Sequence, residues 1–84
     1  MEKEIRYILI TVIDREILTE VFPTLEDAQM AMHSEMIKVG RVPEDVFDCD
    51  AKEDADEGWA YGPYEAYSND GVNHADCDWH IAPI

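Results

Sequence analysis

Residues 5–22 read IRYILITVIDREILTEVF, two runs of β-branched and aromatic residues on either side of a short polar segment. Such residues favour strands, and the polar triplet at 14–16 predicts a turn between them. In the first run both alternating sets are apolar: one face carries Tyr7 and Leu9, and the other carries Ile8, Ile10 and Val12. The stretch therefore predicts a β-hairpin whose first strand is central and covered on both faces.

A helix is predicted next, over residues 25–39. Pro23 ends the second strand, and Thr24 is a candidate N-cap with Asp27 in a capping-box position. Gly40 is expected to end the helix in a left-handed conformation. One apolar stripe, which should cover one face of the sheet, recurs at spacings of three and four: Leu25, Ala28, Met32, Met36 and Val39.

The remaining chain predicts a second hairpin. Pro43 begins a short helical turn, a third strand should begin near Tyr64, and 69–71 is a turn signal. In the last strand Cys77, Trp79 and Ile81 alternate with polar residues. We therefore expect one α+β domain over residues 1–84: a two-layer ββαββ fold with a four-stranded antiparallel sheet and one long helix on one face.

The charge of the chain is strongly negative and unevenly distributed. It has 20 acidic and 6 basic residues, a net charge of −14. Residues 43–84 contribute 12 of the acids and a single basic residue, Lys52. This balance excludes an ordinary nucleic-acid binder, which must neutralise phosphates, and it disfavours an anionic membrane. Residues 44–58 are expected to form an acidic segment with local mobility.

The sequence predicts a cytoplasmic protein. The apolar run at 8–13 is far shorter than the ~20 residues that span a bilayer, and we find no signal peptide. In a reducing compartment Cys49 and Cys77 are expected to be free thiols.

No catalytic site or cofactor is expected. The two serines, Ser34 and Ser68, lie in no nucleophile motif, and the sequence has no glycine-rich phosphate loop. Carboxylate pairs such as Asp76 and Asp78 arise by chance in so acidic a chain. The sequence therefore predicts a protein that is not an enzyme.

The sequence contains ligand types for two kinds of metal site, zinc and calcium, but its spacing favours neither. His74, Cys77 and His80, with Cys49, are zinc ligand types, but a strand would point Cys77 and His80 to opposite faces. A calcium loop lacks glycine where its sharp turn needs one, although it has four candidate carboxylates, Asp48, Asp50, Asp54 and Asp56. A small metal-binding protein stays an alternative.

A basic protein partner is the favoured interpretation of the acidity. An array of carboxylates can imitate the phosphates of a duplex and occupy the groove of a nucleic-acid-binding protein or nuclease. Aromatic residues beside the acids could anchor such an interface, although a small domain also needs them in its core. The candidate partner-binding residues are Glu44, Asp45, Asp48, Asp50, Glu53, Asp54, Asp56, Glu57, Trp59 and Tyr61.

A resemblance points the same way. The segments FPTLEDA at 22–28, VPED at 42–45 and NDG at 69–71, followed by His74 and DWHI at 78–81, resemble small acidic proteins of unknown function from phages and mobile elements of gut Gram-positive bacteria. In character the chain is also similar to the acidic inhibitors by which phages block restriction or CRISPR nucleases. The resemblance in motif carries no activity and assigns no site residue, whereas the similarity in character, which involves no shared motif, favours an inhibitor.

A homodimer is a further alternative. The face of the first strand that carries Ile8, Ile10 and Val12 would then be covered by a second copy. The chain would in that case be a structural or interaction domain.

Overall fold

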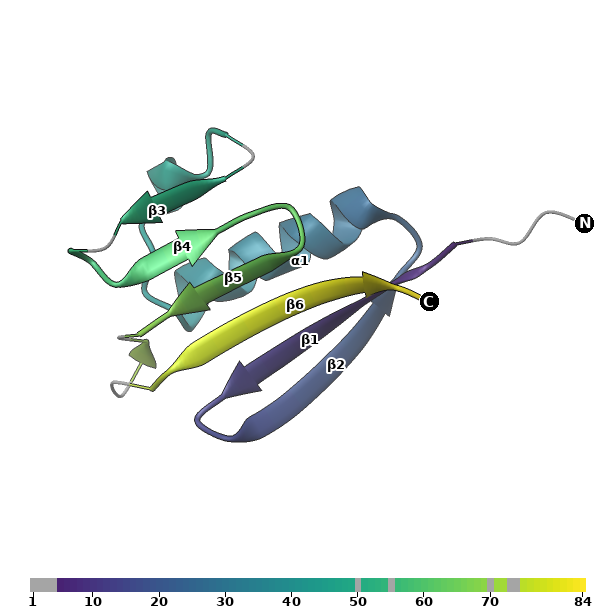
Figure 1. Cartoon of the computed structure of the whole chain (residues 1–84), viewed down its shortest axis with the longest axis horizontal. Coiled ribbons are helices and arrows are strands. Elements are labelled where there is room, and N and C mark those ends of the chain that lie inside the picture. Colours follow the sequence, from purple (N-terminus) through teal and green to yellow (C-terminus); the bar gives the residue numbers. More distant parts are fainter. Residues whose placement is uncertain (1–4, 50, 55, 70, 73–74) are drawn as a thin grey trace, which may run out of the picture.

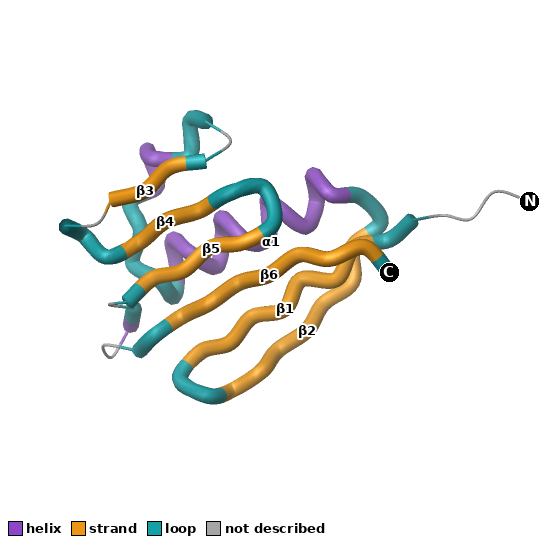
Figure 2. Tube along the Cα trace, viewed as in Figure 1, coloured by secondary structure: helices purple, strands orange, loops and turns teal. Residues whose placement is uncertain are grey.

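A computed structural model describes residues 5–49, 51–54, 56–69, 71–72 and 75–84. Its elements follow one another in the order β1 (Tyr7–Ile13), β2 (Glu16–Phe22), α1 (Leu25–Lys38), the 3₁₀ turn η1 (Glu44–Val46), β3 (Lys52–Asp54), β4 (Trp59–Tyr61), β5 (Glu65–Ser68) and β6 (Cys77–Pro83). Figure 1 shows the sheet in front of the helix, and Figure 2 separates strands from helices by colour.

The strands form one antiparallel sheet of six in the order β2-β1-β6-β5-β4-β3. The α+β class with one long helix is confirmed, but the prediction of four strands is wrong. The third predicted strand, expected to begin near Tyr64, is β5, whereas β4 and the acidic β3 were not predicted. Ladder pairing uses backbone groups, so an edge strand can form from charged residues whose side chains face water.

The first hairpin is confirmed. β1 and β2 pair without a bulge from Tyr7↔Phe22 to Ile13↔Glu16. The turn residues Asp14 and Arg15 both have positive φ, 46° and 76°. A two-residue turn of this kind matches the twist of the strands it joins.

α1 covers one face of the sheet. Its N-cap is confirmed, since the Asp27 backbone N–H donates to Thr24 Oγ1 at 3.1 Å. The predicted stripe faces inward, with Ala28, Met32 and Met36 fully buried. They pack with Leu9 of β1 and with the inward side chains of β6, which alternate as predicted.

The opposite face of β1 is not covered in the same way. Ile8, Ile10 and Val12 are half-buried, and the described part of the chain places no α-helix over them (Figure 1). The second cover that the apolar pattern predicts is therefore not found among the described residues.

The predicted left-handed glycine at the end of α1 is wrong. The left-handed residue is Arg41, with φ 58°, one position after Gly40. Glycine is required at position 40 for a steric reason instead. A Cβ there would lie 2.8 Å from the Met36 carbonyl oxygen and 3.0 Å from the Trp79 ring. The chain leaves the helix so close to β6 that it has no room for a side chain.

Within the described ranges, no helix is long and apolar enough to cross a membrane.

Candidate partner-binding surface

The acidic segment lies at the β3 edge of the sheet. It comprises η1, β3 and the turn into β4, and it presents exposed carboxylates at Glu44, Asp45, Asp48, Glu53, Asp56 and Glu57. Asp54 is half-buried, and Asp50 lies outside the described residues. We call the six exposed carboxylates the acidic edge.

Backbone pairing holds much of the acidic edge in place. β3 pairs with β4 from Lys52↔Tyr61 to Asp54↔Trp59. In the turn that follows, Asp54 accepts the Glu57 backbone N–H on its side chain at 3.1 Å and the Gly58 N–H on its carbonyl at 2.9 Å. Gly58 takes the positive φ of 76° that the turn needs. Local hydrogen bonds thus fix Glu53 and Glu57 relative to the sheet.

The acidic edge has little compensating positive charge of its own. Lys52 is the basic residue of this half of the chain, and its Nζ lies 3.7 Å from Asp48 Oδ1. Both side chains are exposed, so water and salt screen this pair and it contributes on the order of 0–1 kcal/mol. Arg41 lines a small hollow with Glu57, and the other carboxylates of the acidic edge are exposed to solvent.

Trp59 and Tyr61, both predicted to bind a partner, are only 4% exposed. Their registers, Trp59↔Ser68 and Tyr61↔Ala66, turn them to the helix side of β4, so they lie in the core and almost none of either surface can reach a partner. Tyr61 instead supports the acidic edge, since its hydroxyl donates to the Val46 carbonyl at 2.7 Å. Burial and the neighbouring Cys49 raise the pKa of Tyr61 to about 12, so it remains a donor at neutral pH.

The rings of His33, Phe47 and Tyr61 form a cluster between α1 and the acidic segment. His33 stacks on Phe47 with ring centroids 4.4 Å apart, and its ring lies 5.3 Å from that of Tyr61. Burial lowers the pKa of His33, because a charged imidazole is poorly solvated there. The cluster therefore favours a neutral histidine.

Protonation of His33 is expected to weaken the fold. Because the folded pKa lies below the unfolded value of 6.5, the unfolded state binds more protons, and stability falls as pH drops below 6.5 toward the folded pKa. The free energy of unfolding, measured by urea denaturation between pH 7.5 and 5.5, should fall more steeply in the native chain than in His33→Gln. Parallel curves would contradict this expectation, since the variant keeps every other titrating group.

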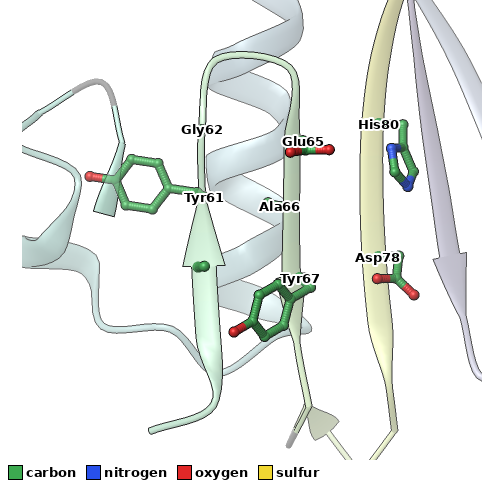
Figure 3. A pocket seen from close by; sticks show the side chains of 8 residues that line it. Tyr61, Gly62, Glu65, Ala66, Tyr67, Asp78 and His80 are labelled. Atoms are coloured by element: carbon green, nitrogen blue, oxygen red, sulfur yellow. The ribbon is translucent and has the colours of Figure 1, made fainter. Parts of the chain in front are cut away.

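A pocket of about 320 Å³ lies on the sheet face opposite α1. Two cross-strand pairs of β5 and β6 form much of it, Glu65↔His80 and Tyr67↔Asp78, over a small-residue floor that includes Ala60. Figure 3 shows the four side chains on neighbouring strands, with the ring of Tyr61 extending away from them. Two carboxylates, an imidazole and a phenol favour a hydrogen-bond donor or a cation. The alternation of β6 in the sequence predicts that Asp78 and His80 lie on one face. That Glu65 and Tyr67 lie beside them could not be predicted, because it depends on the register between β5 and β6.

The zinc ligands are not brought together. Cys77 is buried toward α1, His80 is exposed on the opposite face, and the Cys49 thiol donates to the Ala51 carbonyl at 3.1 Å. Burial, then the charges of Asp76 and Asp78, raise the pKa of Cys77 and disfavour a thiolate. His74 and Asp50 lie outside the described residues. Among the residues that are described, no three His, Cys, Asp or Glu side chains are grouped to hold a metal ion.

Comparison with known proteins adds no relative. No family model, curated protein or solved structure matches the chain.

Proposed function

We propose that the chain is a non-enzymatic, acidic protein-binding module that occupies the basic surface of a nucleic-acid-binding protein or nuclease. One observation supports this above the others. The acidic edge presents six exposed carboxylates on a turn and an edge hairpin, with Lys52 as the basic residue among them. Such an array offers a partner negative charges carried on a hydrogen-bonded turn and hairpin, as a nucleic acid carries its phosphates on a backbone.

Binding would be electrostatic and competitive. The carboxylates would steer the basic partner into contact, so association should be fast and should slow as salt screens the charges. The partner's arginine and lysine side chains would pair with the acidic edge and would no longer be free to bind phosphates. Inhibition follows from occupancy and requires no chemical step by this chain.

The test begins with a pull-down from host lysate at low salt, eluted by a salt gradient. A basic nucleic-acid-binding protein or nuclease that elutes at moderate salt supports the proposal, and its affinity is then measured with variants. The triple variant Glu53→Gln, Asp56→Asn, Glu57→Gln removes charge from the acidic edge. It should weaken binding on the order of tenfold or more, because each carboxylate faces the partner in the complex.

The matched control removes three charges elsewhere. Asp14, Glu16 and Glu26 are exposed and lie outside the acidic edge, so Asp14→Asn, Glu16→Gln, Glu26→Gln makes the same change in net charge. We expect this control to weaken binding less than about threefold, through the long-range field alone. Equal losses in both triples, or capture of only a scatter of basic proteins, would contradict a specific acidic interface.

A further inference from the structure

The two edges of the sheet differ in a way that matters for assembly. β3 is three residues long and consists of Lys52, Glu53 and Asp54. Short, charged edges of this kind resist pairing with other strands. β2, at the other edge, has seven residues, contains no proline or lysine, and pairs with β1 without a bulge. β2 carries two glutamates, Glu16 and Glu20, but it is longer and more apolar than β3, so of the two edges it is the less protected.

β2 also exposes apolar side chains on both of its faces. Ile17 is 68% exposed, Leu18 53% and Val21 48%. The described residues place no strand beside its outer side, where β2 ends the strand order. An edge with free backbone groups and exposed apolar side chains is suited to accept another strand.

The register shows which backbone groups point outward. The Asp14 N–H donates to the Asp76 carbonyl on the β6 side, so alternate residues of β1 beginning with Ile13 direct their N–H and C=O groups to β2. Ile13 faces Glu16 in that ladder. Antiparallel alternation then leaves the N–H and C=O groups of Ile17, Thr19 and Val21 pointing away from β1. These three residues can form a new ladder.

We propose that β2 pairs antiparallel with β2 of a second copy, with Thr19 opposite Thr19. In this register Ile17 faces Val21 of the other copy, and every outward-pointing residue finds a partner. Leu18 then faces Glu20 of the second copy, so no two like charges are opposed. A slip of two residues between the strands would set Glu16 opposite Glu20 in one direction and Glu20 opposite Glu20 in the other, which is unfavourable.

The charge distribution is compatible with a second copy of so acidic a chain. The acidic edge lies at the β3 side, five strand spacings from β2. At about 4.8 Å per spacing, the β3 strands of two copies joined through β2 would be on the order of 50 Å apart. That is several times the Debye length of about 8 Å at physiological ionic strength, so the two acidic edges would scarcely repel one another. The dimer would leave both of them accessible and does not depend on their function.

Because Thr19 would face Thr19 of the second copy, charges introduced at this position test the proposed pairing. The oligomeric state is measured by sedimentation velocity. The native chain is expected to sediment as a dimer at physiological ionic strength. Thr19→Glu and Thr19→Lys should each raise the dimer Kd by at least about tenfold, because two like charges then meet at the two-fold axis. An equimolar mixture of the two variants should recover the dimer, since glutamate then faces lysine. Circular dichroism confirms that each variant is folded.

Met30→Glu is the control, because Met30 is 63% exposed on α1 and the substitution adds the same charge as Thr19→Glu. It should leave the dimer intact. A native chain that sediments as a monomer at all concentrations would overturn the proposal. So would a dimer that persists in both Thr19 variants, or a mixture of them that remains monomeric. If Ile10→Lys dissociates the dimer and the Thr19 variants do not, the copies pack through the open sheet face, which also overturns edge pairing.

Discussion

Replacing Trp79 with alanine should remove a large part of the stability of the fold. Trp79 is 0% exposed and lies on β6, between β1 and β5. Truncating a buried tryptophan costs about 3–5 kcal/mol, whereas a domain of this size has roughly 4–13 kcal/mol in total. Urea denaturation followed by circular dichroism should therefore give a midpoint far below that of the native chain, or no folded baseline.

Trp79→Phe is the matched control for this expectation. It keeps an aromatic ring against α1, and it removes the indole N–H, which is buried with no acceptor among the described residues. The loss should therefore be clearly smaller than for alanine. A surface substitution typically changes the free energy of unfolding by less than about 0.5 kcal/mol. If Trp79→Ala changes it by no more than that, Trp79 is not the centre of the core.

The second large effect is expected at Gly71. A Cβ at this position would lie 2.6 Å from the Val39 carbonyl oxygen and 2.9 Å from Cys77 Sγ. The Val72 N–H donates to the same Val39 carbonyl at 2.8 Å, so the chain is hydrogen-bonded against the end of α1 and cannot retreat without breaking that bond. Gly71→Ala should cost about 1–3 kcal/mol, which is typical of overpacking, and the same urea titration measures it.

Gly62→Ala separates this steric effect from the general cost of replacing a glycine. The nearest atom to a Cβ at Gly62 is the Glu65 carbonyl oxygen, 3.9 Å away. This substitution should change stability by less than about 0.5 kcal/mol. Equal losses at Gly62 and Gly71 would show that the close approach to Val39 does not limit the fold.

The elements that could be predicted from the sequence are those with local signals. The polar triplet between two apolar runs gave the first hairpin, Thr24 marked the start of α1, and alternation identified the buried side of β6. β3 was missed because Lys52–Asp54 has neither alternation nor apolar residues, and it is a strand only because β4 lies beside it. Gly40 was given the wrong role, because its close approach to Trp79 depends on how α1 packs on the sheet.

The candidate surface was predictable to a similar extent. Charge alone located the exposed carboxylates of the acidic edge, since ionised side chains stay in water. Charge could not show that Trp59 and Tyr61 point inward, because that depends on their register with β5. The pocket around Glu65 and His80 could not be predicted either, because it forms only where β5 pairs with β6.

The strand order also constrains how the chain can fold. β1 and β6 lie side by side in the middle of the sheet, yet they are the first and last strands in the element order. The hairpin of β1 and β2 can close early, but its inner edge has no neighbour until β6 has been made. Pairing strands so distant in sequence closes a very long loop, which makes folding slow compared with that of helical bundles. During synthesis β1, the most apolar strand, therefore remains unpaired on its inner edge until β6 has been made. Over that interval the nascent chain is most prone to aggregation and most dependent on chaperones.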